Sequence, residues 1–100
     1  MYSITFNSQC QAVLGKLTQD KQLQLVDFLS NFDAQKVPAA DQIKRDNKLF
    51  YRLKWEAFRI YIESTQKGTL IVHSILSKHS WNDFLFRAKL PYPSENNTPK

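Results

Sequence analysis

The 100-residue sequence contains one cysteine, two glycines and no apolar run long enough to cross a membrane. The single Cys10 excludes an internal disulfide and fits a reducing cytoplasm. Two glycines exclude a glycine-rich phosphate loop. A bilayer span needs about 20 apolar residues, and the N-terminal segment lacks the basic and apolar regions of a signal peptide. We therefore expect a cytoplasmic protein that does not associate with membranes.

Metal ligands are also scarce. His73 and His79 have no third ligand at metal-binding spacing, so the sequence predicts no metal site and no cofactor. Cys10 precedes no catalytic signature and falls within a predicted helix, where a half-buried structural thiol is expected. Any chemistry must therefore come from ordinary side chains.

What the sequence does contain is an excess of positive charge in its second half. Fourteen Lys and Arg against nine Asp and Glu give a formal net charge of +5. Residues 1–43 carry three lysines and four aspartates, whereas residues 44–90 carry ten basic and four acidic residues. This asymmetry favours a polyanionic partner, nucleic acid first. The alternative is a solvated basic surface that only keeps the protein soluble.

Hydropathy periodicity predicts an α+β domain with the element order βααβββα. A period of two indicates strands and a period near 3.6 indicates helices. The predicted elements are a strand over 2–6, helices over 8–17 and 20–33, strands over 49–55, 58–63 and 69–76, and a short helix over 80–88.

Polar residues mark the predicted helix starts. The segment Ser8–Gln11 fits a capping box, and Thr18 or Asp20 can cap the second helix. The segment Ser80–Asp83 repeats the pattern, with an aspartate in place of the usual Glu or Gln. These caps support three separate helices.

The expected fold is an antiparallel sheet of about four strands packed on an N-terminal helical hairpin, with a short C-terminal helix. A single domain covers residues 1–90, and residues 91–100 form a frayed tail after two prolines. The stretch 35–47 shows no period and contains Pro38, so we expect a loop there. His73 lies on the face of Ile71 and Ile75, which suits a core or edge histidine.

A basic cluster stands out on the predicted strands. Alternation places Arg52 and Lys54 on one face, roughly 7 Å apart. Arg59 begins the next strand and lies across a short turn from them. Three cations on adjacent strands repel one another, so their proximity becomes favourable only with an anion among them. The alternative is that they are ordinary solvent-facing residues of a one-sided sheet.

The segments KLFYRLKWEAFRIYIE and TLIVHSILSKHS, together with the element order, resemble the RelE/ParE superfamily of bacterial and archaeal toxins. The resemblance covers nearly all of residues 1–90. It implies one of two activities. RelE-like members cleave messenger RNA in the ribosomal A site without metal, using basic residues on the concave sheet face. ParE-like members lack that cleavage set and poison DNA gyrase.

Carried over by position, the resemblance implies a catalytic set. Arg52 and Lys54 occupy the paired basic sites, Arg59 matches the phosphate-stabilising arginine, and His79 falls where a general acid or base is found. The chemistry agrees. Neighbouring cations favour the neutral form of a lysine, which suits Lys54 as a base. The planar guanidinium of Arg59 suits phosphoryl oxygens, and a histidine titrates near neutrality and suits protonation of the leaving oxygen.

The sequence departs from the RelE pattern at two places. Ala57 replaces the usual glycine before the second strand of the motif, and Phe58 stands for its tyrosine. The late catalytic tyrosine of several nucleases has no equivalent, because Trp81, Phe84 and Phe86 surround its expected place. Aromatic rings can stack on a base, but these three cannot donate a hydroxyl proton.

These observations favour the toxin of a type II toxin–antitoxin system, a ribosome-dependent mRNA endoribonuclease (mRNA interferase) that represses translation. Its expected partners are a cognate acidic antitoxin, the ribosome and mRNA. The alternatives are a ParE-like toxin that acts through protein contacts, and a small basic RNA-binding domain without catalysis. Further RNA contacts are predicted for Lys44, Arg45, Lys48, Lys78 and Trp81.

Overall fold

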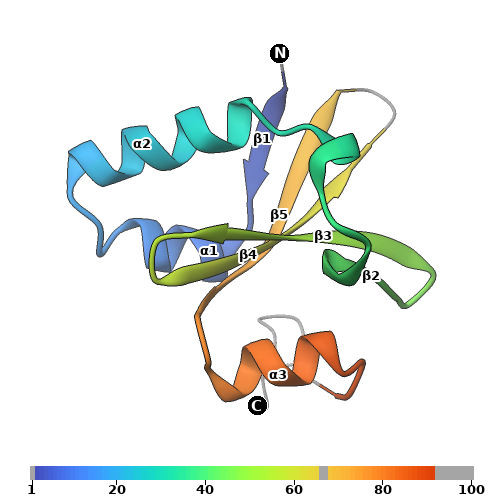
Figure 1. Ribbon diagram of the computed structural model, residues 1–100. Coiled ribbons are helices and arrows are strands. Elements are labelled where there is room, and N and C mark those ends of the chain that lie inside the picture. The colour runs from blue at the N-terminus through green and yellow to red at the C-terminus, as the bar shows by residue number, and fades with distance from the viewer. Residues whose placement is uncertain (1, 66–67, 92–100) are drawn as a thin grey trace.

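A mixed five-stranded sheet with helices on both faces forms the centre of the molecule in the computed structural model, which describes residues 2–65 and 68–91 (Figure 1). Within these residues, no helix is long and apolar enough to cross a bilayer. In chain order the elements are β1 (Ser3–Phe6), α1 (Ser8–Leu14), α2 (Gln19–Ser30), the 3-10 turns η1 (Ala34–Lys36) and η2 (Ala39–Asp41), β2 (Gln42–Arg45), β3 (Lys48–Trp55), β4 (Phe58–Ser64), β5 (Thr69–Ser77) and α3 (Trp81–Arg87).

The strands lie in the order β1-β5-β4-β3-β2. Strands β2 to β5 form an antiparallel meander, and β1 pairs with β5 in parallel. The α+β class, the N-terminal helical hairpin and the C-terminal helix are confirmed. The prediction of a loop over residues 35–47 is wrong, because this stretch contains η1, η2 and β2. Only Ile43 is buried in the four-residue β2, so this strand carries no detectable period.

Side-chain caps begin the helices largely as predicted. The hydroxyls of Thr18 and Ser80 accept hydrogen bonds from backbone N–H groups in the first turns of α2 and α3. Helix α1 is instead capped by Asn7, one residue before the predicted Ser8, and its Oδ1 accepts from the Cys10 N–H at 3.0 Å. The Asn7 amide also donates to the His73 carbonyl at 2.8 Å, which ties α1 to β5. The longer reach of Asn lets one side chain serve both contacts.

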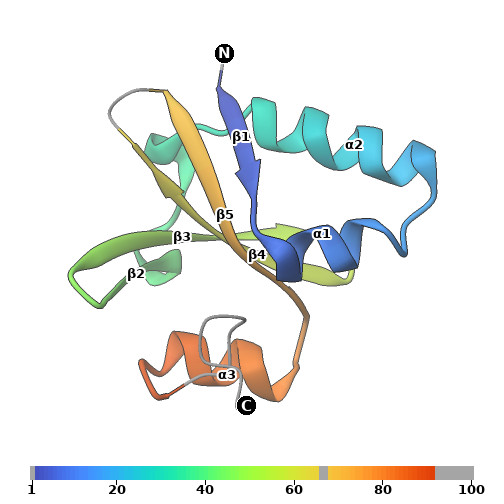
Figure 2. The same ribbon diagram turned by 180° about the vertical axis from the view of Figure 1, so that it is seen from behind.

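The larger core lies between the sheet and the pair α1 and α2. The view from behind shows both helices on one side of the sheet and α3 on the other (Figure 2). Helix α2 contributes Leu25 and Leu29, both fully buried, and β1 adds Tyr2, Ile4 and Phe6 from one face as its alternation predicts. From the central strands this core receives Trp55, Ile60, Ile62, Leu70, Val72 and Ile75.

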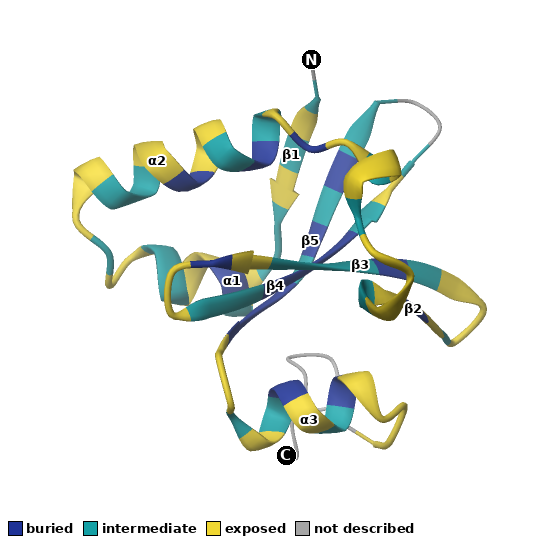
Figure 3. Ribbon diagram, viewed as in Figure 1, coloured by how far each residue is buried: buried dark blue, intermediate teal, exposed yellow. Residues whose placement is uncertain are grey.

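A smaller core lies under α3 and is centred on Phe86, which is fully buried. The burial pattern along the ribbon shows both faces of the sheet covered (Figure 3). The ring of Phe86 meets those of Phe50 and Tyr61, with centroids 5.1 and 4.0 Å away. The remaining buried members are Ile43 and Leu76. Helix α3 therefore docks on the sheet through one aromatic anchor.

A bulge in β5 places His73 in the smaller core. Tyr61 pairs with Ser74 and Ile62 pairs with Val72, so His73 is the extra residue of β5 at this shift in register. Its ring lies 5.1 Å from that of Phe50. The expectation that His73 shares a face with Ile75 is wrong, because the extra residue reverses the alternation that strand reasoning assumes.

Arg45 holds the end of α3. Its guanidinium lies 4.7 Å from the centre of the Phe86 ring. It also donates to the carbonyls of Phe86 at 3.2 Å and Leu90 at 3.0 Å. The Phe86 carbonyl also accepts from the Lys89 N–H at 3.2 Å, so the arginine adds a second hydrogen bond there, and its charge complements the negative end of the helix dipole.

Replacing Phe86 with alanine should lower the free energy of unfolding by about 3–5 kcal/mol, because it removes the buried ring that anchors α3. Phe84 is the matched control: it is 43% exposed on the same helix, so Phe84→Ala should change stability by about 0.5 kcal/mol or less. Urea denaturation of both variants measures the difference. Equal losses would show that burial under α3 does not determine stability.

Candidate functional site

Lys54 and Arg59, here called the cation pair, lie directly opposite each other on β3 and β4. The Lys78 N–H donates to the Ala57 carbonyl at 2.8 Å, so the backbone groups of Ala57, and by alternation those of Arg59, point toward β5. The cation pair is therefore a non-hydrogen-bonded pair, the type in which Cα atoms are only about 4.5 Å apart. Both side chains leave the sheet on the face that carries α3.

The cation pair has no acidic partner among residues 2–65 and 68–91. Arg59 Nη1 donates to the Phe58 carbonyl at 2.8 Å and to the Glu56 carbonyl at 3.4 Å. Its Nε is buried without a hydrogen-bond partner in the described part of the chain. Like charges directly opposite each other destabilise a sheet. An anion bound between them would remove this repulsion and complete the hydrogen bonding of Arg59.

Arg52 lies on the same face as the cation pair, but its guanidinium is bound by acidic side chains. Its Nη2 and Nε donate to the two carboxylate oxygens of Asp83 at 2.8 and 3.1 Å, and Nη1 lies 3.4 Å from an oxygen of Asp41. The Tyr61 hydroxyl, opposite on β4, donates to the same Asp83 carboxylate. Asp83 is fully buried, and the Arg52 side chain is 11% exposed. We call Arg52, Tyr61 and Asp83 the buried network.

The buried network holds Asp83 ionised. Burial acts to raise the pKa of Asp83, but hydrogen bonds from Arg52 and Tyr61 and the charges of Arg52 and Arg87 outweigh it, so the pKa lies below its usual value. Burial also raises the pKa of the Tyr61 hydroxyl, and its bond to Asp83 raises it further. Burial opposes the charged form of Arg52, but the interactions with Asp83 win and raise its pKa.

Sequence reasoning missed the roles of Asp83 and Tyr61. Asp83 was expected to complete a capping box, but the cap is formed by the Ser80 hydroxyl and the Asp83 carboxylate points at Arg52 instead. The one available signal was an acidic residue on the apolar side of a short helix. Its partner Arg52 is 31 residues away in the sequence, so a pattern of neighbouring residues could not predict the contact.

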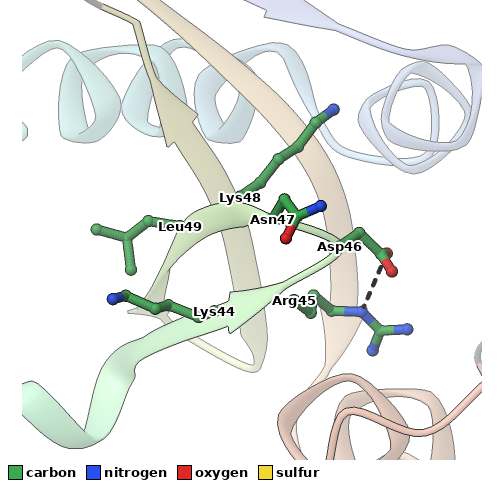
Figure 4. A pocket seen from close by; sticks show the side chains of 6 residues that line it. All are labelled: Lys44, Arg45, Asp46, Asn47, Lys48 and Leu49. Carbon is green, nitrogen blue, oxygen red and sulfur yellow. Dashed lines mark ion pairs between the residues drawn. The ribbon is translucent and has the colours of Figure 1, made fainter.

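The remaining predicted residues fall into two groups. Lys44, Arg45 and Lys48 surround the two-residue turn between β2 and β3 and line a hollow of about 560 Å³ (Figure 4). Lys48 Nζ lies 3.7 Å from a Glu63 oxygen, and Lys44 points away from Arg45. Six residues of extended β3 separate Lys48 from Lys54, a span of about 20 Å. The structure therefore does not bring this group to the cation pair.

The second group lies near the cation pair. The Lys78–Ala57 backbone bond places Lys78 beside the β3–β4 turn, and His79 follows in the connection that leads to α3. His79 is exposed and adopts a left-handed backbone conformation with φ 61°. Trp81 is 70% exposed and stacks on Phe84 with centroids 5.2 Å apart. These residues continue the exposed surface from the end of β5 to the start of α3.

The site has no metal-binding set. Across residues 2–65 and 68–91, no group of three or more His, Cys, Asp or Glu side chains converges as ion ligands.

Comparison with known structures identifies the fold. A double arginine-to-alanine mutant of the E. coli toxin RelE in the free state matches with a TM-score of 0.61 and 15% identity, covering 88% of this chain and 95% of that one. The isolated E. coli RelE toxin matches with 0.58 and 15%, covering 84% and 92%. The E. coli RelBE toxin–antitoxin complex matches with 0.53 and 15%, covering 80% and 100%. No protein-family model and no curated protein sequence matches. The chain has a RelE-like fold.

Arg52→Ala should lower the free energy of unfolding by about 3–5 kcal/mol, because it leaves the buried Asp83 carboxylate without its charge partner. Arg59→Ala, the matched control on the neighbouring strand, should change stability by about 0.5 kcal/mol or less, since it relieves repulsion within the cation pair. Thermal or urea unfolding separates the two. Equal losses would contradict the structural role assigned to Arg52.

Stability should also fall as the pH drops from about 7 to 5, through His73. Burial lowers the pKa of His73. The charge of Glu63 raises this pKa, and the charges of Lys48 and Arg45 lower it further. Below the ordinary histidine pKa of about 6.5 the unfolded chain takes up a proton that the folded chain does not, which costs up to about 1.4 kcal/mol per pH unit. His73→Asn should flatten this slope in urea titrations, whereas His79→Ala, at an exposed position, should leave it unchanged.

Proposed function

We propose that this protein is the toxin of a type II toxin–antitoxin system, a RelE-like endoribonuclease that cleaves mRNA on the ribosome and represses translation. The observation that carries the proposal is the cation pair: two basic side chains held in the closest cross-strand position, with no acidic partner in the described chain. A phosphate diester supplies the charge that this arrangement lacks. The RelE-like fold supports the same reading.

Metal-free RNA cleavage needs three tasks done around one phosphate. The 2′-hydroxyl must lose a proton as its oxygen attacks the adjacent phosphorus, the charge of the phosphorane must be stabilised, and the departing 5′-oxygen must gain a proton. Lys54, which lies directly opposite Arg59 on the neighbouring strand, takes the first proton. Arg59 offers Nε and Nη atoms to the phosphoryl oxygens, and His79 protonates the leaving oxygen. The products are a 2′,3′-cyclic phosphate and a 5′-hydroxyl.

Arg52 takes a supporting part in this proposal. Its guanidinium is committed to Asp83 and Asp41, so it holds α3 on the sheet beside the site and makes no direct bond to the reacting phosphate. The resemblance to the RelE/ParE superfamily implied a catalytic role for it, and strand alternation gives it the same face as Lys54.

The outer residues provide RNA binding. Trp81 and Lys78 lie beside the site and are exposed, which suits stacking on a splayed base and contact with a flanking phosphate. Lys48, about 20 Å away along β3, and Lys44, on β2, are suited to phosphates of a more distant RNA segment. Arg45 is largely occupied with α3, so we assign it a structural role first.

RNA binding without cleavage is the second candidate, and one observation favours it. Within the described residues, the tyrosine on the face of the cation pair is Tyr61, and its hydroxyl is buried on Asp83. Proton transfer therefore depends on Lys54 and His79 alone. A ParE-like toxin that acts on DNA gyrase through protein contacts is the remaining alternative.

Single-turnover cleavage of mRNA in the ribosomal A site, measured alongside ribosome binding, distinguishes the three candidate functions. Arg59→Ala and Lys54→Ala should each slow cleavage by about 10²–10³-fold, by analogy with the loss of an oxyanion donor, and weaken ribosome binding far less. Lys16→Ala is the matched control, since it removes an exposed lysine in the connection between α1 and α2, outside the site, and should leave the cleavage rate near wild type.

Equal losses of cleavage and binding in the site variants would leave an RNA-binding patch and overturn the catalytic assignment. No cleavage by the wild-type protein, combined with inhibition of purified DNA gyrase, would favour the ParE-like alternative.

A further inference from the structure

Glu56 is the acidic residue closest in sequence to the cation pair. It lies in the turn between β3 and β4, two residues after Lys54 and three before Arg59. Its backbone carbonyl accepts from Arg59 Nη1 at 3.4 Å, so the Arg59 guanidinium lies close to this turn. The Glu56 carboxylate therefore starts within reach of the cation pair, yet it forms no ion pair with Lys54 or Arg59.

The Glu56 carboxylate is bound by helix α2 instead. Lys21 Nζ lies 2.6 Å from Glu56 Oε2, with the two side chains 42% and 41% exposed. Both ribbon views show the N-terminal end of α2 and the β3–β4 turn toward the same end of the molecule (Figures 1 and 2). Trp55 and Phe58, on either side of the turn, pack into the larger core beneath α2. The ion pair thus draws the carboxylate toward the α2 side of the sheet, whereas the cation pair extends on the α3 side.

Contacts other than the ion pair fix the position of Lys21. The Thr18 hydroxyl accepts from the Lys21 N–H at 3.2 Å and caps α2. The Gln22 amide donates to the Leu14 carbonyl at 2.7 Å, which ties the start of α2 to the end of α1. Leu25, one turn further along α2, is fully buried in the larger core. The fold therefore holds an ammonium group beside the β3–β4 turn.

The position of one carboxylate decides whether the cation pair is open to an anion. A carboxylate placed on Lys54 and Arg59 would relieve their repulsion and occupy the place of a phosphate. An exposed ion pair favours one side-chain arrangement over another by only about twofold to fivefold. Lys21 therefore adjusts the affinity of the site for an anion and does not create it.

We propose that Lys21 is a positioning residue for the anion site: it holds the Glu56 carboxylate on the α2 side of the sheet and so keeps the cation pair open to a phosphate diester. Without Lys21, the Glu56 carboxylate turns to the cation pair and competes with the phosphate. The inference deepens the proposed function and rests on it for the identity of the anion. It couples the N-terminal helical hairpin to a site on the opposite face of the sheet.

Binding of a deoxyribodinucleotide tests the proposal without cleavage, because this phosphate diester lacks a 2′-hydroxyl. The dinucleotide is titrated at low salt into the full-length protein, and NMR follows the Arg59 Nε–H signal. Lys21→Ala should weaken binding about twofold to fivefold. Lys21→Arg keeps the positive charge and should bind as tightly as wild type. Lys16→Ala, which removes an exposed lysine from the connection between α1 and α2, should leave the affinity unchanged.

A second substitution separates the freed carboxylate from a structural role of Lys21. Glu56→Gln added to Lys21→Ala should restore wild-type affinity, whereas Asp20→Asn, the same change at an exposed residue of α2, should not. In the free protein, Lys21→Ala should shift the Arg59 Nε–H signal, and Glu56→Gln should reverse the shift. The proposal is overturned if the wild type does not bind the dinucleotide, if Lys21→Ala binds as tightly as wild type, or if Glu56→Gln restores nothing.

Failure here and failure of the proposed function are distinguishable. Dinucleotide binding that depends on Lys21 and Glu56, in a protein that cleaves no mRNA, would retain the positioning role and discard the nuclease. Cleavage of mRNA by a protein whose dinucleotide affinity ignores both residues would do the reverse.

Discussion

The ionised carboxylate of Asp83, fully buried under α3, is the constraint on which one whole face of this protein depends. A buried charge is tolerated only when it is paired and hydrogen-bonded, and Arg52 and Tyr61 meet both conditions from two neighbouring strands. Helix α3 has only seven residues and would not persist alone in water, so its position follows from this pairing, from the Phe86 anchor and from Arg45 at its end. The three contacts join the N-terminal, central and C-terminal parts of α3 to the sheet.

Fixing α3 in this way divides the face beneath it into three regions. The middle is filled by aromatic rings and the buried network. The β2–β3 hairpin at one end and the β3–β4 turn at the other remain open and basic. Arg52 and Lys54 lie two residues apart on the same face of β3. The Asp83 carboxylate of α3 neutralises Arg52, whereas Lys54 has no acidic partner among the described residues. Positive charge on this face is therefore exposed at its two ends and neutralised in the middle, and the cation pair lies at the β3–β4 end.

The cation pair has no acidic partner among the described residues, so it destabilises the sheet locally. Lys54 and Arg59 repel each other in the free protein, and the sheet is held together by the two cores on either side of it. A site that is unfavourable when empty binds an anion more readily, because part of the interaction energy comes from relief of repulsion.

Local pattern determined a large part of this structure. Alternation along Leu49–Trp55 and Phe58–Glu63 fixed the strands and, with the short turn between them, brought Lys54 and Arg59 to one face, because the side-chain period of a strand is two. Hydroxyl caps at Thr18 and Ser80 fixed two helix starts, because capping uses neighbours within three residues. Tertiary structure alone decided that β1 joins the sheet in parallel, that a bulge turns His73 toward α3, and that Arg52 is neutralised. Each of these depends on partners tens of residues apart, and the contact energies that select them arise only when the chain has packed.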